Sequence, residues 1–229
     1  MTDADMEGAG RTTIAKTIKR GKVNRDVRAA RASSATDAIG DLTPGCEIFI
    51  LTYGQFSLID AIAALLRKTG PADVILSTWT AGHTDLTTCA NLLEGPEITS
   101  FRMMVDRSFL TRQPGYCRRM IDLFGVDCLR TWRAHAKFAV IKNEKWSLAI
   151  RTSMNLNTNP RLENLEVSDD PTLCEFFVTI TDELFGEQVS GVFDGELPKL
   201  KGVKFTDLEK IQMGRATAAP TPTCNRRIG

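Results

Sequence analysis

Apolar runs separated by turn residues organise the middle of the chain. The run over 46–52 is almost entirely apolar and is typical of a buried strand. After it, Ser57 and Asp60 have the spacing of a helix-capping box, the apolar residues that follow fall on one helical face, and Gly70 ends the segment. The pattern therefore predicts a strand followed by a helix.

The same alternation continues towards the C-terminus. Order is expected to begin near residue 36, and the residues at 143–145 form a plausible hairpin turn. The further segments expected are strands at 73–77, 97–105, 126–132, 136–142, 146–152 and 165–167, and helices at 85–94, 114–124 and 171–185. Strands that alternate with helices predict an α/β domain whose mixed, mostly parallel sheet is flanked by helices.

Composition divides the chain into three parts. Residues 1–36 are predicted to be a basic N-terminal arm and linker, 37–213 a single domain, and 214–229 a disordered tail, because that tail has too little apolar content to pack.

Net charge is only +1, but it is distributed unevenly. Between Arg11 and Arg31 there are eight basic residues and one acidic residue, so this segment is +7 and the remainder −6. Such asymmetry favours a polyanionic partner such as nucleic acid. A solvated basic tail without a partner is the alternative. The candidate phosphate contacts in this segment are Lys16, Lys19, Arg20, Lys22, Arg25 and Arg28.

Several classes of protein are excluded. No apolar run approaches the ~20 residues of a membrane span, and the first ten residues have no apolar core of a signal peptide, so a cytoplasmic protein is expected. The six cysteines form no Cys-x-x-Cys pair and there are two histidines, so no zinc site is predicted. Glycine-rich nucleotide-binding motifs are also missing.

One pair of predicted strands contains a suggestive set of polar residues. His135 and Lys137 are two apart at the start of one strand, and Ser153 and Asn155 are two apart at the end of the next. Residues at this spacing share a face of a strand, so four polar groups are expected at one end of a hairpin. The alternatives are a structural histidine and a polar loop or helix cap.

These residues resemble the signature of the phospholipase D superfamily, H-x-K-x4-D followed by G-S-x-N on the next strand. The matching positions are His135, Lys137, Ser153 and Asn155, and Glu163 corresponds to a downstream glutamate of single-motif bacterial nucleases of that superfamily. The resemblance extends more weakly over 46–186. A surface carboxylate is the alternative interpretation of Glu163.

The chain departs from the signature at two positions, and its hairpin is about three residues longer than the usual motif. Lys142 stands where the signature has Asp, and Thr152 stands where it has Gly.

The resemblance implies a mechanism that uses no metal or cofactor. His135 attacks phosphorus and forms a phosphohistidine, because neutral imidazole is a competent nucleophile near neutral pH. Lys137 and Asn155 hold the non-bridging oxygens. Ser153 and Glu163 orient the imidazole.

A phospholipase D-like phosphodiesterase is therefore predicted, with DNA as the expected substrate and RNA as the alternative. Arg133 and Arg151 are candidate contacts to the nucleic-acid backbone, with a solvated strand face as the alternative. A phospholipid substrate is disfavoured because no membrane-binding helix is evident. The competing hypothesis is a catalytically inactive protein of the same fold that binds DNA or regulates.

A single motif copy also predicts a homodimer with one composite active site. The superfamily uses a second histidine as the general acid, whereas His83 has no neighbouring lysine and is interpreted as a loop residue. Trp79, Trp132 and Trp146 are interpreted as packing residues, since they show no regular interleaving with basic residues.

Overall fold

A computed structural model describes residues 23, 25–29, 34–109, 114–132 and 134–187, and the structural statements below refer to these residues. The tail predicted over 214–229 lies outside them. Most of the predicted basic arm lies outside them as well.

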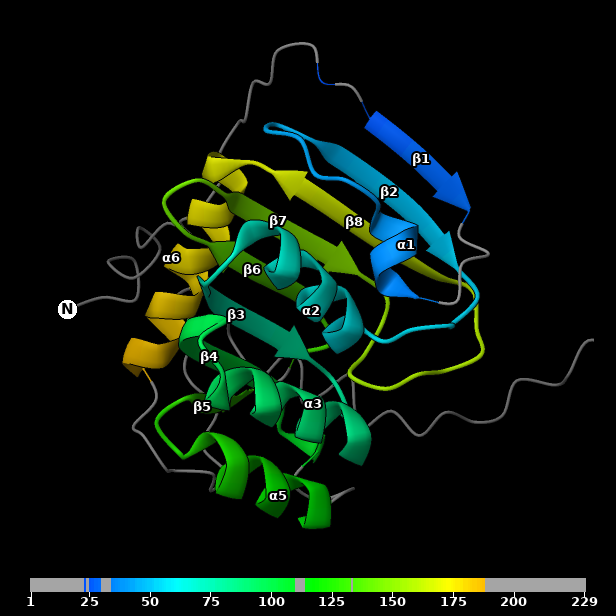
Figure 1. Cartoon of the computed structure of the whole chain (residues 1–229). Coiled ribbons are helices and arrows are strands. Elements are labelled where there is room, and N and C mark those ends of the chain that lie inside the picture. Colours follow the sequence, from blue (N-terminus) through cyan, green and yellow to red (C-terminus); the bar gives the residue numbers. More distant parts are fainter. Residues whose placement is uncertain (1–22, 24, 30–33, 110–113, 133, 188–229) are drawn as a thin grey trace, which may run out of the picture. The chain divides into compact units, whose positions relative to one another are not determined.

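The described chain folds into eight strands and five helices (Figure 1). The strands are β1 (Arg25–Ala29), β2 (Glu47–Thr52), β3 (Ala72–Thr78), β4 (Ile98–Asp106), β5 (Leu129–Trp132), β6 (Phe138–Lys142), β7 (Ser147–Thr152) and β8 (Glu163–Asp169). The helices are α1 (Ala35–Ile39), α2 (Leu58–Thr69), α3 (His83–Glu94), α5 (Pro114–Phe124) and α6 (Pro171–Glu187). No helix among the described residues is both long and apolar enough to cross a membrane.

All eight strands join one mixed sheet in the order β1-β2-β8-β7-β6-β3-β4-β5. The pairs β1–β2, β3–β4 and β4–β5 are parallel, whereas the four pairs that involve β6 or β8 are antiparallel. The prediction of a mostly parallel sheet is therefore wrong. Its physical reason is that β6 and β7 form a hairpin and β8 inserts between β2 and β7, which the order of elements along the chain does not reveal.

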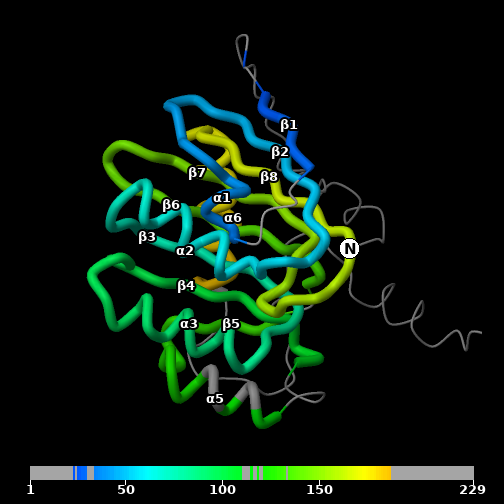
Figure 2. Tube along the Cα trace, turned by 45° about the vertical axis from the view of Figure 1, so that its right-hand side comes forward, coloured from blue at the N-terminus to red at the C-terminus, as the bar shows by residue number. Residues whose placement is uncertain are grey.

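Side-chain alternation along the strands builds a core on each face of the sheet. In β6, Ala139 and Ile141 belong to the main apolar core, which α2 covers. Phe138 points the opposite way and stacks on Phe177 of α6, with 4.5 Å between the ring centroids. Figures 1 and 2 show α2, α3 and α5 on one face of the sheet and α6 on the other. A strand buried on both faces explains why this region has an unbroken apolar run.

The capping box predicted for α2 is present. Ser57 Oγ accepts from the backbone N–H of Asp60, and the Asp60 carboxylate accepts from the backbone N–H of Ser57 at 2.9 Å. The next helix, α3, begins at His83 rather than at the predicted residue 85, because Gly82 takes the N-cap position. His83, which was expected in a loop near a helix start, is instead the first residue of that helix.

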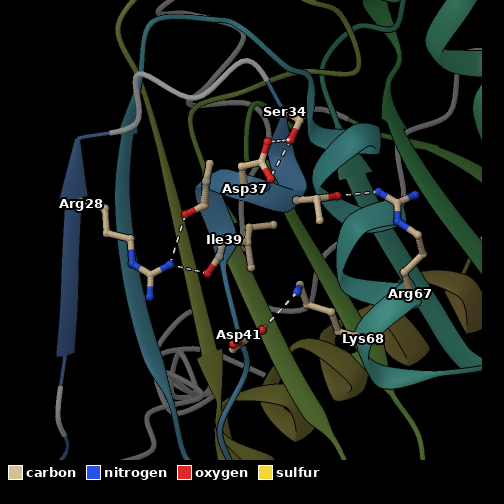
Figure 3. A network of polar contacts seen from close by, with 9 residues as sticks. Arg28, Ser34, Asp37, Ile39, Asp41, Arg67 and Lys68 are labelled. Carbon is tan, nitrogen blue, oxygen red and sulfur yellow. Dashed lines mark hydrogen bonds and ion pairs between the residues drawn. The ribbon is translucent and has the colours of Figure 1, made fainter.

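Order begins earlier than residue 36, since β1 adds to the sheet within the range assigned to the arm. Arg28 of β1 donates to the backbone carbonyl of Ala38 at 3.2 Å and to that of Ile39, at the C-terminal end of α1 (Figure 3). On the other side of α1, Arg67 of α2 donates to Thr36 Oγ1 at 2.8 Å. These contacts connect β1 and α2 through α1.

The absence of a side chain at Gly54 lets the β2–α2 connection pass close to the loop before β8. Gly54 has a φ of 78°, and a Cβ at this position would lie 1.7 Å from the carbonyl oxygen of Asn159. Gly45 has a similar φ of 72° but nothing within 4 Å of its Cβ position. A comparison of the two positions therefore distinguishes the effect of the left-handed backbone conformation from the effect of a steric clash.

We predict that Gly54→Ala destabilises the fold more than Gly45→Ala. Both variants carry the left-handed backbone penalty of about 1–2 kcal/mol, but only Gly54→Ala adds a clash with backbone, worth about 1–3 kcal/mol more. Urea denaturation of the two variants measures the difference in the free energy of unfolding. Equal losses would show that no close backbone approach exists at Gly54.

Candidate active site

The predicted catalytic residues lie at one edge of the sheet, where strands of opposite direction begin and end. His135 and Lys137 immediately precede β6, Ser153 immediately follows β7, and Glu163 is the first residue of β8. Because β6 and β8 run antiparallel to β7, these positions meet at the same edge.

The expected strand over 136–142 starts only at Phe138, so His135 and Lys137 are not strand residues that share a face. They nevertheless contact each other. Lys137 Nζ lies 3.2 Å from His135 Nδ1, 3.3 Å from His135 Nε2 and 3.0 Å from the His135 carbonyl oxygen. The lysine side chain therefore folds back onto the histidine, and the imidazole itself is exposed.

Two opposing effects act on the pKa of the Lys137 ammonium group. Partial burial lowers the pKa of Lys137 below the usual value for lysine, and the negative charge of Glu163 opposes that shift. The Glu163 carboxylate therefore favours the charged form of Lys137.

Hydrogen bonds from three other segments hold the backbone on both sides of His135. Asp106 Oδ2 accepts from the Ala134 N–H (3.0 Å), Ser77 Oγ donates to the Ala136 carbonyl (3.0 Å) and the Thr152 N–H donates to the Lys137 carbonyl (3.3 Å). These bonds come from the ends of β3, β4 and β7. Sequence reasoning did not identify Asp106 or Ser77, since their role depends on which strands are neighbours.

Ser153 and Glu163 are directly bonded. Ser153 Oγ donates to the Glu163 carboxylate and accepts from the backbone N–H of Asn164 at 3.0 Å. Among the described residues neither Ser153 nor Glu163 hydrogen-bonds the imidazole, so their role in orienting His135 remains a prediction.

Asn155 lies where the loop after β7 meets the start of α2. Its backbone carbonyl accepts from the N–H of Leu58 at 3.3 Å. Its side-chain Oδ1 is buried and has no hydrogen-bond partner within the described part of the chain. A buried acceptor without a partner is costly, so this carbonyl oxygen is an atom that a hydrogen-bond donor, such as water, would satisfy.

Trp79 is a site residue that the sequence interpretation missed. It directly follows β3, and its ring lies against the imidazole of His135, with centroids 5.1 Å apart and planes inclined by 56°. Its position directly after a buried strand could have indicated that Trp79 lies at an end of the sheet. Its contact with His135 could not be predicted, because it depends on the pairing of β3 with β6.

Of the two departures from the superfamily signature, Thr152 is the last residue of β7 at this edge, whereas Lys142 lies away from it. Lys142 is the last residue of β6 and its Nζ lies 3.4 Å from Glu175 Oε2 on α6. At about 3.3 Å per extended residue, seven residues separate it from His135 by roughly 20 Å. Lys142 lines a cavity of about 390 Å³ at that far end, together with Asn143 and Arg102.

The described arginines predicted to bind nucleic acid have carboxylate neighbours. The ion pairs are Arg25–Glu47 (2.8 Å), Arg28–Asp26 (2.7 Å) and Arg151–Glu166 (2.7 Å). Nucleic-acid contacts by these side chains stay predictions, as do those of the residues outside the described ranges, namely Lys16, Lys19, Arg20, Lys22 and Arg133.

The two fully buried cysteines differ from the candidate nucleophile in their environment. Burial raises the pKa of the Cys89 and Cys174 thiols to about 12, so both stay protonated near neutral pH. Within 25–29, 34–109, 114–132 and 134–187, no three His, Cys, Asp or Glu side chains gather as a metal site.

No protein-family model matches the chain, and no curated protein matches it either. Solved structures do. NucT from Helicobacter pylori is 13% identical, with a TM-score of 0.44 over 63% of this chain and 99% of that one. Nuc from Salmonella typhimurium, a phospholipase D family member, is 15% identical, with a TM-score of 0.38 over 57% of this chain and 90% of that one.

A polyphosphate kinase from Porphyromonas gingivalis is 13% identical, with a TM-score of 0.45 over 65% of this chain but only 27% of that one. The resemblance to the phospholipase D superfamily rests on the His135-x-Lys137 and Ser153-x-Asn155 pattern of the sequence.

Proposed function

We propose that the protein is a phosphodiesterase that cleaves nucleic acid by nucleophilic attack of His135. The observation that supports the proposal is the contact between the exposed imidazole and the Lys137 ammonium group at the sheet edge. An exposed nucleophile beside a cation suits an anionic phosphodiester, which the cation both attracts and positions.

In the proposed reaction, a ring nitrogen of His135 forms a bond to phosphorus while the bond to the leaving oxygen breaks. The leaving oxygen takes a proton from a general acid, and water then hydrolyses the phosphorus–nitrogen bond. Lys137 and Asn155 bind the non-bridging oxygens, because the ammonium group brings a positive charge and the side-chain amide N–H of Asn155 is a hydrogen-bond donor. Ser153 and Glu163 act as a bonded pair behind them.

DNA is the proposed substrate, with RNA as the alternative. The excess of basic residues before residue 32 supports a nucleic-acid substrate, since cations give sequence-independent affinity for phosphates. Arg25 and Arg28 contribute less than the rest of that segment in this proposal, because they form ion pairs within the domain.

A homodimer is proposed to complete the site. The chain has one His-x-Lys motif, whereas the reaction needs a nucleophile and an acid on opposite sides of phosphorus. Two-fold symmetry supplies the second imidazole if His135 of each subunit lies at the axis.

The competing hypothesis, an inactive binding protein, was motivated by the replacement of the motif Asp by Lys142. The distance of Lys142 from the candidate site weakens that motivation.

We predict that His135→Ala abolishes cleavage of plasmid and single-stranded DNA, in chelator as well as without it, because the imidazole forms the covalent bond. The matched control is His83→Ala at the start of α3, which is expected to keep wild-type activity. Nicking assays and gel retardation measure cleavage and binding separately. Retardation by a wild type that does not cleave would favour the inactive binder, and a strict Mg²⁺ requirement would contradict the mechanism.

We predict that activity falls at high pH as Lys137 loses its proton, and that Glu163→Gln moves this alkaline limb to lower pH. Lysine is charged below its pKa, burial already lowers that pKa, and removing the Glu163 charge removes the influence that raises it. The pH profile of kcat/KM on bis(p-nitrophenyl) phosphate measures the shift. Glu144→Gln, in the β6–β7 turn, is the control. A limb that stays in place or moves upward would contradict the role of Lys137.

We predict that refolding wild type with an equal amount of His135→Ala leaves about a quarter of the dimers with both imidazoles if subunits pair at random. Specific activity should then fall to about a quarter of that of pure wild type, whereas independent sites would retain about half. Light scattering checks the mass of the active species. Retention of half the activity, or a monomeric active species, would rule out the composite site.

A further inference from the structure

We propose that Trp79 is a positioning residue whose indole holds the His135 imidazole in the orientation from which it attacks phosphorus. This inference rests on the proposed function, since it assigns the support of that nucleophile. It starts from the ring contact of 5.1 Å between the two side chains.

The backbone around His135 is already fixed. Hydrogen bonds hold the residues on both sides of it, through the N–H of Ala134 and the carbonyls of Ala136 and Lys137. The remaining freedom of the nucleophile is rotation about its two side-chain torsions. An exposed side chain ordinarily populates several rotamers, whereas attack on phosphorus requires one orientation.

Within the described residues, Lys137 and Trp79 both lie against the imidazole, and they differ in rigidity. Lys137 reaches the ring through a flexible four-carbon chain, which suits a mobile charge better than a fixed support. Trp79 presents a large planar ring with only two side-chain torsions. The indole is therefore the contact able to restrict the imidazole.

The backbone at Trp79 is itself held on both sides. Thr78 is fully buried, and its Oγ1 donates to the carbonyl of Thr80 at 2.9 Å. The Thr80 carbonyl also accepts from the N–H of Leu156 at 3.2 Å, in the loop that contains Asn155. The segment that carries the indole is thus hydrogen-bonded to the loop that contains Asn155, the candidate phosphate-binding residue.

Proton NMR tests the contact without any need for activity. His83 and His135 are the only histidines, so their ring protons give two sets of signals that His83→Gln assigns. The ring current of the indole is expected to shift the His135 signals from their unstructured positions. Trp79→Leu should move those signals towards the unstructured values and leave the His83 signals in place.

Kinetics on bis(p-nitrophenyl) phosphate, which has no nucleobase to stack, test the consequence. Misplacing a reacting group lowers the rate more than it lowers binding, so Trp79→Leu is expected to reduce kcat about tenfold with little change in KM. Trp79→Phe should restore most of kcat, since it keeps an aromatic ring. Trp146→Leu, just before β7 at the far end of the hairpin, is the matched control and should retain wild-type kcat.

Unchanged His135 signals in Trp79→Leu, or an unchanged kcat, would overturn the positioning role. A rise in KM for DNA without any loss of kcat on the small ester would also overturn it, in favour of base stacking. Failure of the proposed function has a different result: His135→Ala would then cleave like wild type, whatever happens to the NMR signals.

Discussion

The antiparallel insertion of β6 and β8 among strands that run the other way is the constraint on which the candidate site depends. In a parallel α/β sheet, the beginning of one strand and the end of its neighbour lie at opposite edges. Here β6 pairs antiparallel with both β3 and β7, so the residues before it lie beside the residues that follow those two strands. His135, Trp79 and Ser153 meet for this reason.

The same arrangement explains the backbone hydrogen bonds around His135. β6 is central, buried on both faces, and paired on both sides with strands that are themselves interior. The segment just before it forms hydrogen bonds with the ends of three strands, β3, β4 and β7. The exposed side chain of His135 therefore extends from a backbone that is hydrogen-bonded on both sides.

Charge is separated along the molecule in a way that composition alone does not show. Arg25, Arg28 and Arg151 are basic residues in the printed sequence, yet each is neutralised by a neighbouring carboxylate. At the sheet edge, by contrast, the ammonium group of Lys137 lies beside the His135 imidazole, and the charge of Glu163 also acts on it. A cation in an ion pair is already partly satisfied by its carboxylate.

What the sequence determined by itself follows from local rules. The capping box at Ser57, the helix over 114–124 and the hairpin around Asn143 depend on contacts within a few residues, so the pattern predicts them correctly. The roles assigned to the H-x-K and S-x-N residues stay predictions, although His135, Lys137 and Ser153 lie at one edge of the sheet. Tertiary structure decided the direction of most strand pairs, the addition of β1 to the sheet, and the contact of Trp79 with His135. All three features depend on which strands become neighbours. Strand pairing is determined by the burial of both faces of the sheet, which involves residues far apart in the sequence and is not encoded in any local pattern.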